Sequence, residues 1–469
     1  LTADRGLNRA RETIMASWLK AALDYVPAWI EHQMALTEQP GCAIAITHKG
    51  KVVLERAFGI ASERTGEKLT PRHRFRIASH SKTFTAAAIM LLREDGRLSL
   101  DDPAGLYVEG LHPDVAAATL EQLLSHSSGL IRDGGDAGQW QNERPFLDEA
   151  DLRRDLAAAP VIAASTRFKY SNHAFGLLGL VIEAVTGETY GDFVTRAILK
   201  PHRLTEITPD MPLPAGTPFV TGHGRKLPLG RRPIVPGDNP THALAAATGF
   251  VASAGHLARF FASLDPAAAS SPLTPSSRRD MTRRQWSLPH MADATDYGLG
   301  VSRSKVGDWS WFGHGGAFQS GLSTTMVIEG RDLAVCVLTN AIDGPAAEWA
   351  AGIVHILQTF EQRGAATART RDWSGRWWSL WHTADLVPVA DGVLVADPAL
   401  LRPLDHAAEI AVTGRDKGFV RLAGGYDIHG EGAALRRDGK GAVAEVVLGG
   451  SRLLREAAMK RFLKRRFPD

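Results

Sequence analysis

Two pairs of short strand-like runs, lying far apart in the sequence, constrain the fold of this chain more than any other feature. The first pair covers 42–48 and 51–58, and the second covers 322–328 and 333–338. Within each pair, a turn that contains glycine separates two runs of strand character. Each pair therefore predicts an antiparallel hairpin.

The sequence between the two hairpins has a different pattern. Residues 79–92 are rich in Ala and Leu and predict a buried helix, and residues 101–264 alternate helical runs with loops rich in Pro and Gly. A further helix is predicted over 346–362. We expect an α+β fold, in which one antiparallel sheet built from both ends of this segment is flanked by helices and a helical subdomain is inserted between them.

The chain has 469 residues, so more than one domain is expected. We assign a first domain to 1–363, a small charged linker to 364–371 and a second domain to 372–469. Short strand-like pieces separated by glycine-containing turns fill the second domain, which predicts a small β-barrel or sandwich with a basic tail at 460–466.

The composition of the chain limits the classes of partner that are expected. With 54 basic and 51 acidic residues the net charge is only +3, so nucleic acid is not an expected partner. No apolar run is long enough to predict a membrane span. Cys42 and Cys336 lie in strand-like runs and are expected to be buried thiols. The first residues show no leader pattern, so we expect a cytoplasmic location, with a periplasmic location after removal of a leader as the alternative.

Ser79 and Lys82 are the first candidate catalytic residues. On a helix, positions three apart share a face, so the lysine amine can lie beside the serine hydroxyl. A serine at a helix N-terminus also has backbone N–H groups and the positive end of the helix dipole close to it. A capping serine with a solvated lysine is the structural alternative for this pair taken alone.

Tyr170 and Asn172 form the second candidate group. A lysine ammonium near a tyrosine favours the phenolate, which could take a proton from Ser79 and return it to a leaving group. Asn172 offers an amide to a substrate. A loop tyrosine before a helix N-cap is the alternative interpretation.

The third candidate segment is His314-Gly315-Gly316-Ala317, placed just before the predicted strand 322–328. Its glycines allow a backbone to approach a ligand closely. An edge strand here could pair with an extended substrate and supply an oxyanion donor from the Ala317 N–H.

Together these segments resemble the serine β-lactamase and penicillin-binding-protein superfamily, in particular the group of class C β-lactamases, family VIII esterases and D-aminopeptidases. The resemblance covers about residues 20–362. Its motifs stand in the family's order, as Ser79-x-x-Lys82, Tyr170-x-Asn172 and His314-x-Gly316.

The resemblance implies that Ser79 is the nucleophile, that Lys82 and Tyr170 handle its proton, and that the N–H groups of Ser79 and Ala317 form the oxyanion hole. It also implies that loops such as 134–144 and 222–239 shape the substrate pocket. His314 replaces the lysine common in the third motif, and a neutral imidazole suits a substrate carboxylate less well. We therefore expect weak β-lactam hydrolysis.

We interpret the protein as a serine hydrolase without cofactor or metal that cleaves amides or peptides, including those with D-residues. One alternative is a carboxylesterase. The other is a sensor or scaffold that is acylated by a β-lactam and turns over slowly. The substrate is expected to be a small molecule or peptide, and a homo-oligomer is left open. The second domain resembles the lipocalin-like domain of some D-amino-acid peptidases in this group.

Overall fold

The computed structural model describes residues 2–227, 229–290, 295–424 and 427–468, with side chains of the first helix from Ser17 onward. The chain divides into two compact units, one of residues 39–350 and one of residues 1–38 with 351–469. The domain limits expected from the sequence, 1–363 and 372–469, were placed where the residue pattern changes. The division into two units is instead based on contacts between residues, so the first helix, α1 (Thr2–Thr37), and most of α10 (Ala346–Arg363) group with the C-terminal strands.

The unit of residues 39–350 is built on a nine-stranded sheet in the order β3-β2-β1-β14-β13-β12-β11-β10-β9. The strands are β1 (Gly41–His48), β2 (Lys51–Ser62), β3 (Glu67–Lys68), β9 (Trp286–Leu288), β10 (Thr295–Tyr297), β11 (Ser302–Val306), β12 (Trp309–Phe318), β13 (Gly321–Ile328) and β14 (Leu333–Thr339). Strands β1 and β14 pair antiparallel, with Ala45 opposite Cys336. Both are buried almost throughout, which explains their continuous apolar sequences. The two predicted hairpins thus join into one antiparallel sheet, and the expected α+β fold is confirmed.

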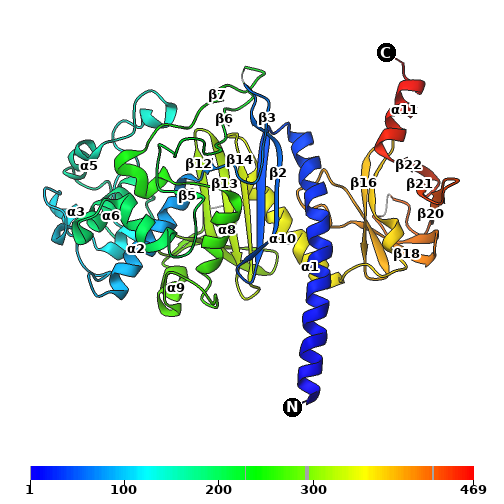
Figure 1. Ribbon diagram of the computed structural model, residues 1–469, viewed down its shortest axis with the longest axis horizontal. Coiled ribbons are helices and arrows are strands. Elements are labelled where there is room, and N and C mark those ends of the chain that lie inside the picture. The colour runs from blue at the N-terminus through cyan, green and yellow to red at the C-terminus, as the bar shows by residue number, and fades with distance from the viewer. Residues whose placement is uncertain (1, 228, 291–294, 425–426, 469) are drawn as a thin grey trace. The chain divides into compact units, whose positions relative to one another are not determined.

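Helices surround this sheet. They are α2 (Ser81–Glu94), α3 (Pro113–Ala116), α4 (Leu120–Leu124), α5 (Glu149–Leu156), α6 (Asn172–Thr186), α7 (Tyr190–Val194), α8 (Ala254–Ser263) and α9 (Pro275–Thr282). Helix α8 packs against β1 and β14, and Figure 1 shows α2, α3, α5 and α6 grouped to one side of the sheet as a helical subdomain.

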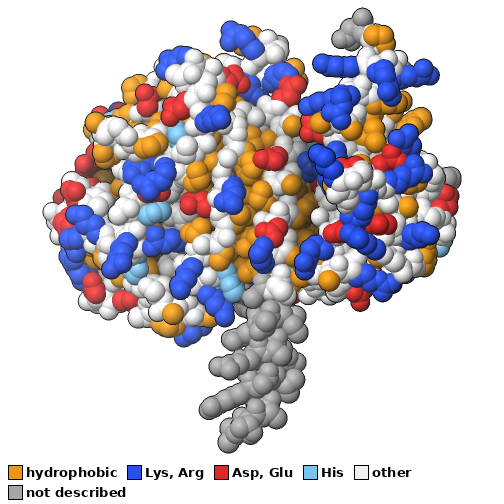
Figure 2. Space-filling model, turned by 45° about the vertical axis from the view of Figure 1, so that its right-hand side comes forward, with side chains coloured by type: hydrophobic (Ala, Val, Ile, Leu, Met, Phe, Trp, Pro, Cys, Tyr) orange, Lys and Arg blue, Asp and Glu red, His pale blue; other side chains and the backbone are white. Residues whose placement is uncertain are grey.

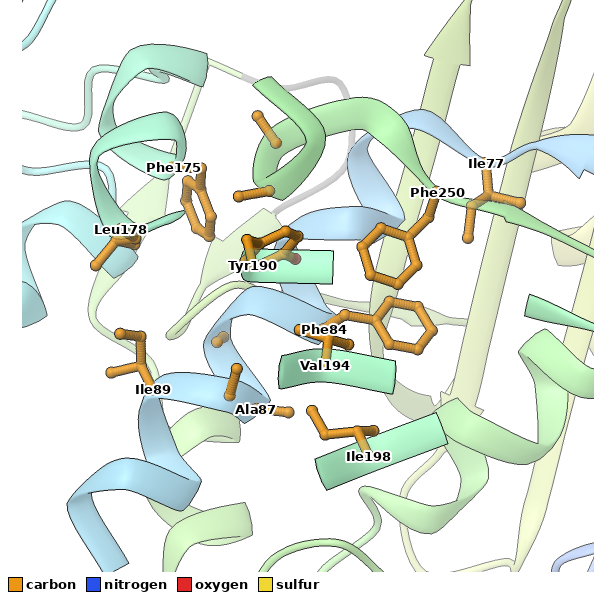
Figure 3. Packing of buried hydrophobic residues seen from close by; sticks show 14 of the residues in the cluster. Ile77, Phe84, Ala87, Ile89, Phe175, Leu178, Tyr190, Val194, Ile198 and Phe250 are labelled. Atoms are coloured by element: carbon orange, nitrogen blue, oxygen red, sulfur yellow. The ribbon is translucent and has the colours of Figure 1, made fainter. Parts of the chain in front are cut away.

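Aromatic packing holds α2 in place within this subdomain (Figure 3). The ring of Phe84 stacks on Phe250 at 4.4 Å and on Phe260 at 3.7 Å between centroids. Burying each of these side chains contributes about 2–3 kcal/mol. The same helix carries Lys82, so this packing fixes the position of a candidate catalytic residue.

Two small pairings lie beside the main sheet. Strands β4 (Phe75–Arg76), β8 (Val251–Ala252) and β5 (Ile207–Thr208) form one small sheet, and β6 (Gly222–His223) and β7 (Ile234–Val235) form a hairpin. Strand β4 of the first small sheet ends two residues before Ala78, so this sheet determines the course of the chain into the Ser79 segment.

The other unit contains a closed barrel of strands β15 to β22. The strands are β15 (Gly375–Trp378), β16 (Thr383–Val389), β17 (Gly392–Ala396), β18 (Ala408–Gly414), β19 (Lys417–Leu422), β20 (Gly432–Arg437), β21 (Val443–Leu448) and β22 (Ser451–Leu454). The pair Trp378 and Leu454 closes it. Of the two predicted architectures, the barrel is therefore the correct one, and the basic tail folds as α11 (Glu456–Arg466).

Cys42 and Cys336 are buried and free, as expected. Within the described ranges, no helix is both long enough and apolar enough to cross a membrane.

Candidate active site

Ser79 lies in a short turn, η1 (Ala78–His80), that leads directly into α2. Ala78 has a φ of 45°, which lets the chain turn sharply just before the serine. Ser81 Oγ donates to Ala78 O (2.6 Å) and accepts from the Phe250 N–H (3.0 Å), so hydrogen bonds fix the turn. The Ser79 side chain is partly exposed whereas residues 80–90 are buried. Its hydroxyl is thus the group of this turn that a ligand can reach.

Lys82 is completely buried and directs its amine at Ser79. Its Nζ lies 3.2 Å from Ser79 Oγ, 2.7 Å from Asn172 Oδ1 and 2.8 Å from Ala247 O. Burial lowers the pKa of Lys82 well below its ordinary value, and the nearby charge of Asp133 only partly opposes this. Because two carbonyl-type oxygens accept two of its hydrogens, an unprotonated amine would direct its lone pair at Ser79 Oγ.

Tyr170 contacts the same hydroxyl from another direction. Its Oη donates to Ser79 Oγ at 2.7 Å, and Lys82 Nζ lies 4.7 Å from the centroid of its ring. Burial raises the pKa of Tyr170, and the hydrogen bond to Ser79 opposes this only in part. The phenolate expected from an adjacent ammonium is therefore disfavoured, since burial acts on both groups and favours the neutral form of each.

Asn172 connects Lys82 to a second layer of polar groups. Its Nδ2 donates to Asp133 Oδ1 at 2.5 Å, and the same oxygen accepts from Trp140 Nε1 at 2.9 Å. Asp133 Oδ2 lies 3.1 Å from Arg132 Nε. These bonds hold the amide with its oxygen toward Lys82.

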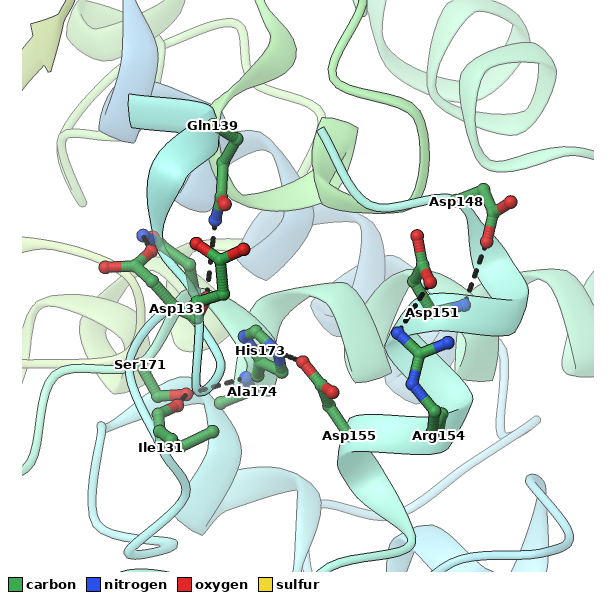
Figure 4. A network of polar contacts seen from close by, with 12 residues as sticks. Ile131, Asp133, Gln139, Asp148, Asp151, Arg154, Asp155, Ser171, His173 and Ala174 are labelled. Carbon is green, nitrogen blue, oxygen red and sulfur yellow. Dashed lines mark hydrogen bonds and ion pairs between the residues drawn. The ribbon is translucent and has the colours of Figure 1, made fainter. Parts of the chain in front are cut away.

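Hydrogen bonds of Ser171 to Ile131 and Ala174 fix the start of α6 (Figure 4). Ser171 is the N-cap, since its Oγ accepts from the Ala174 N–H at 3.0 Å, and it donates to Ile131 O at 2.6 Å. The Tyr170-Ser171-Asn172 segment is therefore tied to both its helix and the loop that carries Asp133.

The third predicted motif lies inside β12, directly before β13, which corresponds to the predicted strand 322–328. A Cβ atom on Gly316 would lie 2.1 Å from Ile77 O and 2.5 Å from Ser323 Oγ. Only glycine lets β12 approach the turn that carries Ser79 this closely. Strand β11 pairs with β12 only as far as Gly313, so 314–318 form a local edge beside Ser79.

His314 is buried and both of its ring nitrogens have partners. Nδ1 lies 2.6 Å from Gly315 O, and Nε2 lies 3.1 Å from Tyr297 Oη. Burial lowers the pKa of His314 to about 3, and the neighbouring His80 and Lys82 act in the same direction. The imidazole is neutral at pH 7 and supplies no positive charge to a ligand.

An open cavity of about 850 Å³ lies in front of Ser79. Tyr170, Asn172 and Ala317 line it, whereas Lys82 lies behind the serine and His314 and Gly316 lie outside the lining. The structure thus brings Ser79, Lys82, Tyr170 and Asn172 into direct contact through hydrogen bonds, and it places β12 against them.

Sequence reasoning missed Arg132, Asp133, Trp140 and Arg225 as individual residues of the cavity. Both loops implied by the family resemblance, 134–144 and 222–239, do contribute to the lining. Membership of those loops was the only signal for Trp140 and Arg225, and Arg132 and Asp133, which precede the first loop, had none. The direction of each side chain depends on how its loop folds. Among the described residues, no group of three or more His, Cys, Asp or Glu side chains is arranged to hold a metal ion.

Comparison with known proteins identifies the family of this chain. The family described as Beta-lactamase matches residues 26–358. Protein flp of Staphylococcus aureus (strain MRSA252) is 32% identical over 183 residues, which cover 38% of this chain and 36% of that protein. The match thus spans little more than a third of that curated relative.

Two solved structures extend the comparison. The crystal structure of SurE has a TM-score of 0.62 and 25% identity, covering 93% of this chain and 100% of SurE. A D-stereospecific amidohydrolase from Streptomyces sp. has a TM-score of 0.56 and 25% identity, covering 69% of this chain and 94% of that one.

Proposed function

Because the chain belongs to the β-lactamase family of serine hydrolases, we propose that Ser79 is the nucleophile of an enzyme that cleaves amide or peptide bonds through an acyl-enzyme. The observation that carries this proposal is the pair of contacts at Ser79 Oγ, 3.2 Å from Lys82 Nζ and 2.7 Å from Tyr170 Oη. Such contacts activate a hydroxyl that is otherwise a weak nucleophile.

In this proposal Lys82 is the base that takes the proton from Ser79. Its lowered pKa makes the amine the better proton acceptor of the two neighbours, since the pKa of Tyr170 is raised. As the Oγ–carbon bond forms, the proton of Ser79 moves to Nζ. The Tyr170 hydroxyl donates to Oγ before and during this step.

Tyr170 then serves the leaving group. When the carbon–nitrogen bond breaks, the Tyr170 hydroxyl gives its proton to the departing nitrogen, and the Lys82 ammonium restores it. Water then attacks the acyl-enzyme and the same proton transfers run in reverse. Tyr170 takes a proton from the water and passes its own proton to Lys82, and Lys82 returns a proton to Ser79 Oγ as the acyl group leaves. Each cycle therefore returns both side chains to their starting protonation states.

The N–H groups of Ser79 and Ala317 are assigned to the oxyanion hole. The Ser79 N–H stands at the entrance to α2, where the helix dipole favours negative charge. Ala317 lies on the local edge of β12 and lines the cavity, so its backbone is close to where the substrate carbonyl must lie.

A substrate with a D-residue on the acyl side is supported by the likeness to the D-stereospecific amidohydrolase. The neutral His314 further supports a substrate that does not need a cation in the third motif.

The nucleophile is tested by covalent labelling. A fluorophosphonate should add its mass to the wild-type protein and not to Ser79→Ala. Ser81→Ala, a change at the buried serine two residues away, is a matched control and should still be labelled if the turn folds. Labelling of Ser79→Ala at the wild-type rate would contradict the assignment.

The bond cleaved is tested by a turnover screen on matched compounds. D- and L-amino-acid p-nitroanilides, short p-nitrophenyl esters and a chromogenic cephalosporin are compared by kcat/KM. We expect turnover of the D-anilides above the L-anilides and little of the cephalosporin. Activity on the esters alone would replace the amidase proposal with the esterase.

A further inference from the structure

One charged group in the cavity takes no part in the mechanism proposed above. Arg225 lines the cavity and is exposed to it, and its guanidinium has neither a hydrogen bond nor an ion pair with any described residue. It follows the hairpin strand β6 by two residues. An unpaired guanidinium facing a catalytic cavity is available to a ligand.

The other charges of the cavity neutralise one another. The charged lining consists of Arg132, Asp133 and Arg225. Asp133 uses one oxygen for Asn172 and Trp140 and the other for Arg132, so it is not free to pair with Arg225. The cavity is left with one uncompensated positive charge, at Arg225.

Arg225 is carried by a hairpin whose base is anchored. His223 is buried, its Nδ1 lies 2.9 Å from Asn340 O and its carbonyl accepts from the Ile342 N–H at 3.0 Å. The Gly224 N–H donates to Pro233 O at 2.7 Å. The base of the hairpin therefore holds a defined place at the end of β14, and the arginine extends from a fixed point.

The hairpin also meets the strand that borders Ser79. A Cβ on Gly222 would lie 2.1 Å from the Cβ of Ser320, in the turn that follows β12. A substrate extended along the local edge 314–318 thus runs from Ser79 toward this hairpin. The lining of the cavity includes an apolar group, which consists of Trp140, Ile234, Val235, Pro236, Phe318 and Ile342.

We propose that Arg225 is a specificity residue that binds an anionic group, such as a carboxylate, on the part of the substrate that lies beyond the Phe318 end of β12. Guanidinium groups bind carboxylates through two parallel hydrogen bonds, which favours an anionic over a neutral ligand. The substrate class is then an amide whose apolar portion carries a negative charge. The inference rests on the proposed function, because it identifies the cavity with the substrate site.

The positive charge of Arg225 compensates for the lack of a cation in the third motif. His314 is buried and neutral, so no cation comes from β12. The sequence-based expectation of a weak demand for a carboxylate considered that motif alone. Arg225 supplies a cation from a different wall, and a carboxylate can be selected after all.

The test measures binding separately from catalysis. N-acetyl-D-phenylalanine and N-acetyl-D-phenylalaninamide, which differ only in the charged group, are titrated calorimetrically into the full-length Ser79→Ala protein. We expect the acid to bind about tenfold more tightly than the amide, as for a charge-assisted hydrogen bond at a partly exposed site. In the Ser79→Ala/Arg225→Gln protein this preference should disappear.

Arg231→Gln in the same background is the matched control. Arg231 is exposed on the same hairpin but does not line the cavity, so this variant should keep the preference. Equal affinity for acid and amide, no measurable binding of the acid, or an unchanged preference in Arg225→Gln would overturn the inference. None of these outcomes depends on whether Ser79 is the nucleophile, which the fluorophosphonate experiment decides.

Discussion

The buried carboxylates of the barrel unit and the buried Lys82 of the other unit have different kinds of partner. In the barrel unit, the buried carboxylates pair with arginines. Glu445 meets Arg436 at 2.9 Å and Arg452 at 2.5 Å, and Asp385 meets Arg376 at 2.7 Å. In the other unit, Lys82 is more deeply buried but meets only neutral oxygens.

This difference shows how burial can make a lysine amine such as Lys82 a base. For a buried carboxylate beside a guanidinium, the partner compensates for lost hydration. A buried lysine without a directly bonded carboxylate is shifted toward the neutral amine. The barrel pairs thus contribute to structure, whereas the surroundings of Lys82 prepare it to accept a proton.

The largest expected effect comes from removing the buried amine. Lys82→Met should slow fluorophosphonate labelling of Ser79 by about a thousandfold or more, because the other neighbour of Ser79 Oγ, the Tyr170 hydroxyl, has a raised pKa and is the poorer proton acceptor. Intact-mass kinetics measure this rate. Lys82→Arg, which keeps a charge that cannot be lost near neutral pH, should be equally slow, and a rapid rate in that variant would contradict the role of a neutral amine.

Tyr170→Phe should reduce turnover of a D-amino-acid anilide by about a hundredfold, since it removes the donor to Ser79 Oγ and the proton for the leaving nitrogen. A p-nitrophenyl ester releases a phenolate that needs no proton, so its turnover should fall less. Steady-state kinetics on both compounds check this. Equal losses on the two would show that Tyr170 acts only before bond cleavage.

Gly316→Ala tests the close approach of β12 to the Ser79 turn. The added methyl group would overlap Ile77 O, and we expect a loss of about 1–3 kcal/mol in unfolding free energy. The displaced turn should also slow labelling on the order of tenfold. Gly315→Ala is the control, because its Cβ would lie 3.6 Å from its nearest neighbour. Equal behaviour of the two variants would contradict the steric argument.

The smallest effect is expected in the barrel. Glu445→Gln weakens two pairs with arginines that are mostly exposed, so the unfolding free energy should fall by about 1 kcal/mol and Ser79 labelling should not change. Chemical denaturation and labelling kinetics measure the two quantities. A slower labelling rate would mean that barrel charges also influence the catalytic cavity.

The sequence predicted the parts of the site that depend on short spacing. Lys82 follows Ser79 by three residues on a helix, and Asn172 follows Tyr170 at the start of another, so local geometry determines their directions. Family resemblance then supplied the order of the motifs. The sheet was predictable as well, because β1 and β14 are nearly continuous apolar runs and a clear turn joins each of them to a second run of strand character, β2 or β13.

The protonation states and the pocket were not predictable in the same way. The pKa of Tyr170 depends on how completely the fold buries it, and proximity to Lys82 alone suggested the opposite direction. Asp133 and Arg225 lie on irregular loops, whose course depends on contacts such as that of His223 with Asn340. Such contacts join residues far apart in the sequence and leave no local pattern.

The pH dependence of Ser79 labelling tests the role of Lys82 most directly. The unprotonated fraction of Lys82 grows as pH rises through its lowered pKa, so the labelling rate should increase with pH and reach a plateau well below the ordinary lysine pKa of about 10.4. In Tyr170→Phe the same plateau position should persist at a lower rate. A labelling rate that rises only as pH approaches 10 would contradict the account, because it would mean that Lys82 is an ordinary ammonium at neutral pH.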